Sequence, residues 1–305
     1  MIQTKFRWWL ALMFTMAAVI PTRSPSAEPL RVVASTSTMA YFAKQIGGDL
    51  VDVEAIAAGN RDLHYVEVLP SHMLKLRNAD LFVIVGLELD MWWEPMVAGS
   101  RNSGLTVVDC SKGVEPLEVP TFKADARHGD LHRFGNPHYW LDPDNVPVIC
   151  TTITDAMMAA DPDHADAYTS GRDRYLTRFS EKVETWRSQR PALGTVRFVA
   201  YHNSWPYLCK FFGCHTVGFV EEFPGVAPSP SHLARLIGRI TAERIPAVVY
   251  EPFHDPRIPN MLAEKTGCRA IELSESIGGL EGTDTYEALM DSIIAALLPL
   301  AEKNP

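Results

Sequence analysis

"HADAYTSGRDRYLTRFSEKVETWRSQR" (164–190) decides the fold, because it is a long, charged stretch without a strand-like run. Its apolar residues recur at roughly helical spacing: Ala167, Phe179, Val183 and Trp186. Pro162 suits the first helical turn and Pro191 ends the pattern, which gives about thirty residues of helix where the usual mean is roughly 11–12. We therefore expect one long linking helix within residues 161–191.

Short apolar runs alternate with helical stretches on both sides of this segment. Four runs precede it and four follow it: 30–35, 51–56, 81–86 and 105–110, then 196–201, 214–220, 247–252 and 268–273. Strands separated by helices indicate βα units and parallel sheets that are covered on both faces. The predicted fold class is α/β, with two lobes, each a parallel sheet flanked by helices, joined by one long helix. The lobes are expected at 28–160 and 192–305.

Residues 1–27 have the features of a secretory signal peptide. Lys5 and Arg7 precede the apolar run 8–20, which is shorter than the roughly 20 apolar residues of a membrane-spanning helix. Cleavage is expected within 24–29, and an uncleaved anchor is the alternative. No cysteine lies near the cut, which excludes a lipid-modified N-terminal cysteine. We therefore expect a protein exported to the periplasm.

The charge balance excludes one class of partner. The formal charge is -9, and removing the three basic residues of the leader changes it to -12. No run of lysine and arginine interrupts this acidic chain, so nucleic acid is not an expected partner.

All five cysteines follow the leader, and an oxidising compartment would allow some of them to pair. Five is odd, so at least one stays free or pairs between chains. Cys209 and Cys214, in "CKFFGC", are expected to straddle a helix end and the next strand. Short spacing alone does not supply disulfide geometry, so their pairing stays open.

Four side chains that can bind metal lie where ligands collect in open parallel sheets, beyond the carboxyl ends of strands. They are His64 in "DLHYVEV", His138 in "NPHYWLDP", His202 after "VRFVAY" and Glu275 in "LSES". Two come from each lobe. Imidazole and carboxylate are the donors that Zn2+ prefers, and Mn2+ or Fe2+ accept them too. Three neutral imidazoles and one carboxylate would leave a bound divalent ion with a net charge of about +1.

Longer segments around these residues carry a resemblance to a known family. They are "DLHYVEVLPSHMLKLRNADLFVIVGLELD" (62–90), "NPHYWLDP" (136–143), "YHNSWPYLCKFFG" (201–213) and "YEPFHDPRIPNMLAEKTGCRAIELSES" (250–276). Together they resemble the signature segments of the metal-specific substrate-binding proteins of ABC importers, the cluster that includes zinc- and manganese-binding periplasmic proteins. The resemblance covers essentially the whole chain after the leader.

The resemblance places the family's four ligands on His64, His138, His202 and Glu275. Both prolines of the family's usual first motif are missing around His64, and many members have Asp where Glu275 stands. His202 matches zinc-type members, whereas several manganese-type members have Glu there. Zn2+ is therefore the expected metal, and Mn2+ or Fe2+ is the alternative.

The resemblance implies a periplasmic high-affinity zinc receptor, not an enzyme, that delivers metal to an ABC permease in the inner membrane. A manganese or iron receptor of the same type is one alternative. The other is an exported zinc hydrolase, but the chain lacks H-E-x-x-H and G-x-S-x-G. We expect a monomer, with a periplasmic metallochaperone as a second partner. A hinge of one helix should resist large closure of the two lobes.

Neighbouring residues have secondary roles in this interpretation. His128 and His132 lie in a short charged loop that either captures metal or is merely solvated, and His254 is expected near a helix start. Three aromatic residues are candidates for a dry wall around the metal, with core packing as the alternative: Trp140, Trp205 and Tyr207. Asp142 is expected to cap the following helix. The remaining four histidines are expected to be structural or surface residues: His72, His164, His215 and His232.

Overall fold

The computed structural model describes residues 28–121, 132–223 and 225–301. The predicted leader and His128 lie outside these ranges. Within them, no helix combines the length and the apolar character needed to cross a membrane.

The first half of the chain alternates strands and helices and then becomes helical. Its elements are β1 Leu30–Thr36, α1 Ser37–Gly47, β2 Val51–Ala57, α2 Pro70–Arg77, β3 Leu81–Ile84, α3 Trp93–Ser100, β4 Thr106–Asp109, α4 Val146–Ala160 and α5 Ala165–Arg187. The second half repeats the alternation. Its elements are α6 Arg190–Leu193, β5 Arg197–Ala200, α7 Pro206–Phe212, β6 His215–Phe219, α8 Pro230–Glu243, β7 Ala247–Tyr250, α9 Arg257–Thr266, β8 Arg269–Glu272 and α10 Tyr286–Ala301.

Two four-stranded parallel sheets form the two lobes, and their strand orders are equivalent: β2-β1-β3-β4 and β6-β5-β7-β8. In register, Ala34 pairs with Ala55 and Val83, and Val199 pairs with Gly218 and Val248. The carboxyl ends of neighbouring strands therefore meet at one edge of each sheet. The predicted fold class is confirmed, and all eight predicted strands are present within two residues of their expected ends.

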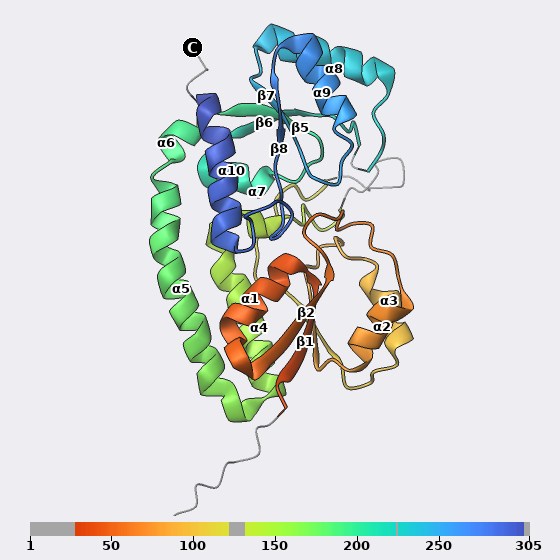
Figure 1. The fold of residues 1–305 in the computed structure, drawn as a ribbon, viewed down its shortest axis with the longest axis vertical. Coiled ribbons are helices and arrows are strands. Elements are labelled where there is room, and N and C mark those ends of the chain that lie inside the picture. The colour runs from red at the N-terminus through yellow and green to blue at the C-terminus, as the bar shows by residue number, and fades with distance from the viewer. Residues whose placement is uncertain (1–27, 122–131, 224, 302–305) are drawn as a thin grey trace, which may run out of the picture.

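Each sheet has an outer and an inner face, because successive side chains of a strand point to opposite sides. On the outer face of the first sheet, Val33 and Phe82 share a buried cluster with Met96 of α3. On the outer face of the second sheet, Val199 and Leu236 of α8 belong to another. Figure 1 shows α2 and α3 beside the first sheet and α8 and α9 beside the second.

The inner faces of both sheets belong to one continuous apolar core. Its aromatic part joins α1, α5 and α10. The ring of Tyr286, at the start of α10, lies 5.3 Å from Phe42 of α1, 5.7 Å from Phe179 and 6.2 Å from Trp186 of α5. Its hydroxyl donates to the backbone oxygen of Trp140 at 2.6 Å. The lobes are therefore joined by packing as well as by the chain, and Figure 1 shows α5 running along both of them.

The linking helix α5 has 23 residues and is shorter than the sequence pattern predicts. Pro162 begins a separate 3-10 turn, which ends at His164. At the other end Pro191 has no amide hydrogen to bond to the carbonyl of Arg187, so the chain turns and α6 starts a new helical turn. The prediction merged three consecutive helical segments into one.

Candidate metal centre

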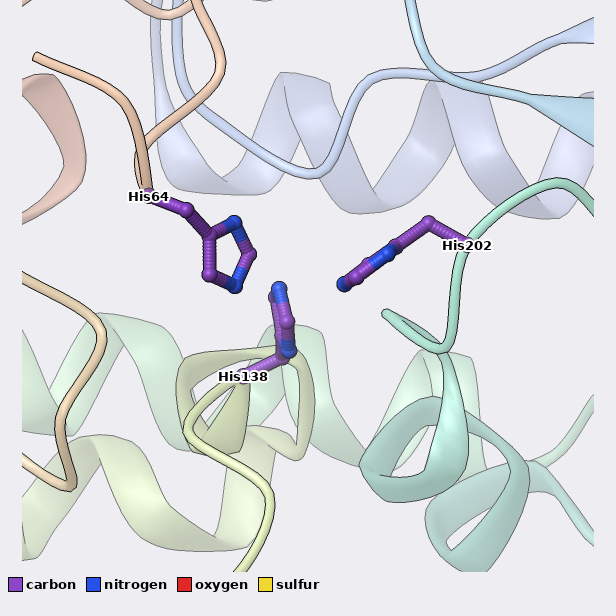
Figure 2. A group of neighbouring side chains, drawn as sticks. All are labelled: His64, His138 and His202. Carbon is purple, nitrogen blue, oxygen red and sulfur yellow. The ribbon is translucent and has the colours of Figure 1, made fainter. Parts of the chain in front are cut away.

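Three histidines from distant parts of the chain meet at one point. One ring nitrogen of each of His64, His138 and His202 lies within 4.8 Å of those of the other two. Figure 2 shows the three rings converging from three separate segments of the chain. His138 and His202 are buried, and His64 is partly buried. The structure thus brings together three of the four predicted ligands.

In each ring, Nδ1 is hydrogen-bonded to a side-chain oxygen of another residue, and this contact fixes the orientation of the ring. Asp62 accepts from His64 at 3.0 Å, Asn136 accepts from His138 at 3.0 Å, and Glu221 accepts from His202 at 2.9 Å. These acceptors are two carboxylate oxygens and one amide oxygen, so each histidine carries its proton on Nδ1. With a proton on Nδ1, Nε2 is the ring nitrogen that would bind a metal.

Local contacts explain how His64 is held without the prolines of the family motif. Asp62 accepts from the backbone amide of His64 as well as from its ring, both at 3.0 Å. Leu63 is fully buried, and its carbonyl accepts from the indole of Trp92 at 2.9 Å. The buried side chain of Leu63 and the two hydrogen bonds to the Asp62 carboxylate therefore hold the segment that carries His64. Burial alone would raise the pKa of Asp62, but its hydrogen bonds and electrostatic interactions with His64, together with those with His202, keep that pKa below its usual value.

The segment around His138 is anchored to the second lobe. The Asn136 side chain accepts from both the backbone amide and the ring of His138 and donates to the backbone oxygen of Asn203 at 2.8 Å. The hydroxyl of Tyr207 donates to the Asn136 carbonyl at 3.0 Å. Burial lowers the pKa of His138 well below its ordinary value, so this ring is neutral.

Trp140 and Asp142 complete this segment. The Trp140 ring lies 5.3 Å from that of His138, and its indole donates to the backbone oxygen of Glu275 at 2.6 Å. Asp142 accepts from the amide of Asp144 at 2.9 Å, so its predicted capping role is confirmed, although the cap belongs to a 3-10 turn that leads into α4.

Glu275 lies at one side of the three histidines. Its Oε2 is 3.4 Å from Nε2 of His138, but it is not part of the group whose ligand atoms are all mutually close. The side chain is buried, and neither carboxyl oxygen has a hydrogen-bond partner within the described part of the chain. Burial raises the pKa of Glu275 to about 7. A buried acid beside a ring nitrogen of His138 is placed to bind a cation.

A second buried acid, which the sequence pattern did not predict as a ligand, lies in the same lobe. Glu251 is fully buried directly after β7, and burial followed by the nearby charge of Glu275 raises its pKa well above the usual value. His254 Nε2 is 3.4 Å from Glu251 Oε2, and its ring stacks on Tyr201 at 4.0 Å. Burial is the main cause that lowers the pKa of His254 to about 4. The predicted helix start holds, since α9 follows at Arg257.

His132 approaches the site from the short charged loop. Its Nε2 lies 3.2 Å from Nε2 of His64, and the two rings are stacked. The next residue is held firmly, because Glu88 accepts from the backbone amide and from Nε of Arg133, both at 2.7 Å. Burial lowers the pKa of His132 to about 3. The Nε2 atoms of His132 and His64 are within hydrogen-bond distance of each other, beside the point where the three predicted ligands meet.

The histidines predicted to be structural or surface residues all lie away from this centre. His72 contacts the Glu67 carbonyl, His164 contacts Asp161, and His232 contacts the Phe219 carbonyl, while His215 is exposed at the start of β6. Sequence analysis missed Glu221, which lies two residues after β6. The strand-end rule that selected His202 would also have selected this carboxylate.

Comparison with known proteins gives a consistent result. The model of a family described as "ZnuA: Zinc-uptake complex component A periplasmic" matches residues 32–298. The high-affinity zinc uptake system protein ZnuA of Bacillus subtilis is 25% identical over 85% of this chain and 81% of its own length. The manganese-binding lipoprotein MntA of Halalkalibacterium halodurans is 26% identical over 88% and 87%. A crystal structure of ZnuA shares the fold, with a TM-score of 0.77 and 24% identity over 91% of this chain and all of that one.

Proposed function

We propose a function from one premise: the chain belongs to the ZnuA family, the periplasmic component A of zinc-uptake complexes. On that premise, the protein binds Zn2+ as cargo in the periplasm and delivers it to an ABC permease in the inner membrane. It acts as a receptor and not as an enzyme. A manganese or iron receptor of the same type is the alternative that the experiments below distinguish.

One observation supports this proposal above the others. Three imidazoles, each oriented through Nδ1, converge so that one ring nitrogen of each lies within 4.8 Å of those of the other two. Zn–N bonds are about 2.0–2.1 Å, so nitrogens within 4.8 Å of one another would each have to move by less than about 1 Å to bind one ion. Three imidazoles favour zinc over manganese, which prefers oxygen ligands.

We propose Glu275 as the fourth ligand. Its buried carboxylate beside His138 would complete a four-coordinate site and leave a net charge of about +1 on the ion. A zinc hydrolase keeps its fourth position for water, so a carboxylate ligand there argues against the hydrolase.

His132 is proposed as a cap on the site and not as a permanent ligand. Its Nε2 lies 3.2 Å from the Nε2 of His64 that the metal needs, so an arriving ion has to displace it. The Glu88–Arg133 contacts set the position from which the cap moves.

We also propose an organisation for the whole chain. A leader of residues 1–27 would be removed on export, and lobes at 28–160 and 192–305 would be linked through 161–191. The shared core supports small movements of loops over large closure of the lobes. The mature protein is proposed to act as a monomer that takes metal free in solution or from a periplasmic metallochaperone.

The decisive experiment measures the metal content of the protein purified from the periplasm after export by its own leader. We expect one zinc ion per chain by elemental mass spectrometry, and sub-micromolar zinc affinity after the metal is stripped. His138→Ala should be isolated without zinc. His215→Ala, which changes an exposed histidine, should keep it and serves as the matched control. Zinc-loaded His138→Ala protein, or manganese as the resident metal, would contradict the proposal.

A further inference from the structure

Two thiols lie together in the part of the second lobe that follows His202 in the sequence. The Sγ atoms of Cys209 and Cys214 are 3.0 Å apart, and both cysteines are free thiols in the structure. Cys209 lies in the middle of α7, and Cys214 directly precedes β6. They form a pair of nucleophilic groups with no part in the metal centre.

The end of α7 dictates this proximity. Gly213 adopts a left-handed conformation with φ of 81°, and its amide donates to the carbonyl of Cys209 at 2.7 Å. This conformation suits glycine because it has no Cβ, and it ends a helix by turning the chain back. The residue after the turn then lies beside the residue before it, so Cys214 meets Cys209.

The two thiols differ in reactivity. Cys214 is 2% exposed, and its hydrogen bond to Cys209 together with burial raises its pKa well above the usual value. That hydrogen bond lowers the pKa of Cys209, which is only partly buried. Thiolates and not thiols attack disulfides, so Cys209 is the group that an oxidant meets first.

We propose that Cys209 and Cys214 are a disulfide site that joins α7 to the start of β6 in the exported protein. The oxidant is a disulfide of an exported thiol oxidoreductase or of glutathione. The Cys209 thiolate attacks one of its sulfurs, forms a mixed disulfide and releases one thiol. Cys214, as its thiolate, then attacks Cys209 Sγ and releases the second thiol. The pair loses two protons and two electrons, and the oxidant gains them.

The position of this bond connects it with two of the metal-binding histidines. Tyr207 of α7 donates to the carbonyl of Asn136, whose side chain orients His138. Two residues beyond β6, Glu221 orients His202. A bond between α7 and β6 therefore restrains both supports at once. It should stabilise the fold and keep the histidines in place.

Peptide mapping tests the bond directly, because trypsin cuts at Lys210 between the two cysteines. In oxidised protein the peptides 198–210 and 211–235 should stay joined and should separate only after reduction. Protein made in a reducing cytosol and then treated with oxidised glutathione should give the same joined pair. The second arm does not depend on export or on metal binding, so its failure is distinct from failure of the proposed function. Separate peptides from both preparations would overturn the proposal, as would a bond from either cysteine to a different one.

Measurements of thermal stability and zinc affinity test whether the disulfide stabilises the fold and holds the two histidines in place. Closing so short a loop should raise Tm by only a few degrees, on the order of 4 °C, over the variant Cys209→Ser/Cys214→Ser. The matched control is Cys268→Ser, whose cysteine lies at the start of β8. Zinc affinity of the double variant, measured by competition with a chromophoric chelator and no reductant, should fall about 3- to 10-fold. If affinity is unchanged while the bond is present, the link to the histidines is wrong.

Discussion

The two lobes have the same strand order but supply their parts of the metal centre differently. In the second lobe each strand is followed within three residues by a buried histidine or carboxylate: His202 after β5, Glu221 after β6, Glu251 after β7 and Glu275 after β8. In the first lobe His64 comes seven residues after β2, and a long connection separates His138 from β4. The second lobe thus places its part of the centre within three residues of strand ends, whereas the first lobe places its part on longer loops.

This difference shows which contacts fix the positions of the metal-binding side chains in each lobe. In the second lobe the sheet itself fixes the donors, because a strand end leaves little freedom over one to three residues. In the first lobe the histidines lie on loops, so hydrogen bonds from neighbouring side chains have to fix their positions instead. Asp62 accepts twice from His64, and Asn136 accepts twice from His138. We therefore expect the first lobe to depend more on its orienting hydrogen bonds.

The largest effect is expected from removing one histidine of each lobe. His138→Ala and His202→Ala should each weaken zinc binding by on the order of 10³-fold, since each removes a direct ligand. Competition with a chromophoric chelator measures the change, and His164→Ala serves as the control because it pairs with Asp161 at a distant helix start. A near-normal zinc affinity of His202→Ala would show that His202, the histidine of the second lobe, is not a ligand.

The next effect concerns Glu275 and pH. Because its pKa is raised to about 7, the carboxyl is half protonated near neutrality and has to lose that proton to bind a metal. Affinity should therefore fall as pH decreases from about 8 to about 6, and zinc binding should release protons in this range. Glu275→Gln should weaken binding about 100-fold and release fewer protons, as measured by calorimetry in buffers of different ionisation enthalpy. An unchanged proton count would remove Glu275 from the ligand set.

A smaller, asymmetric effect is expected from the orienting carboxylates. Asp62→Asn should weaken zinc binding about 100-fold, and Glu221→Gln only about 10-fold, because the short tether after β5 still restrains His202. Glu67→Gln, which changes an acid on the same segment as Asp62, controls for loss of charge. If the two variants lose zinc affinity equally, the distance of a histidine from its strand end does not determine how much it depends on its orienting carboxylate.

The smallest change in affinity is expected from His132→Ala. Removing the cap should leave Kd within about threefold and speed zinc association, since no hydrogen bond at His64 has to be broken first. Stopped-flow measurement with a fluorescent zinc chelator follows the rate. A loss of affinity as large as that of Glu275→Gln would make His132 a ligand.

Sequence patterns predicted much of this architecture because strands and strand ends have local signals. The eight strands, the two lobes and the convergence of His64, His138 and His202 all follow from apolar periodicity and from the resemblance. The length of α5 was overestimated because helical spacing continues across proline turns. The four-ligand assignment, with Glu275 included, stays a prediction.

Other features depend on contacts between distant residues and carry no local signal. Leu63 replaces a proline of the family motif by insertion into the core, where it meets Trp92. His132 reaches His64 across 68 positions of sequence. Glu251 is buried beside Glu275 only because β7 and β8 are neighbours in the sheet. Such positions are found from the three-dimensional arrangement.

The aromatic core shared by α1, α5 and α10 has a consequence for the protein as a folding unit. Tyr286 begins the last helix of the second lobe, yet it packs on Phe42 from the beginning of the first. Separating the lobes would expose these rings to water, so neither half should be expressible as a stable fragment. Heating should instead give a single cooperative transition in calorimetry, and the core of the first lobe is complete only once α10 of the second lobe has folded against it.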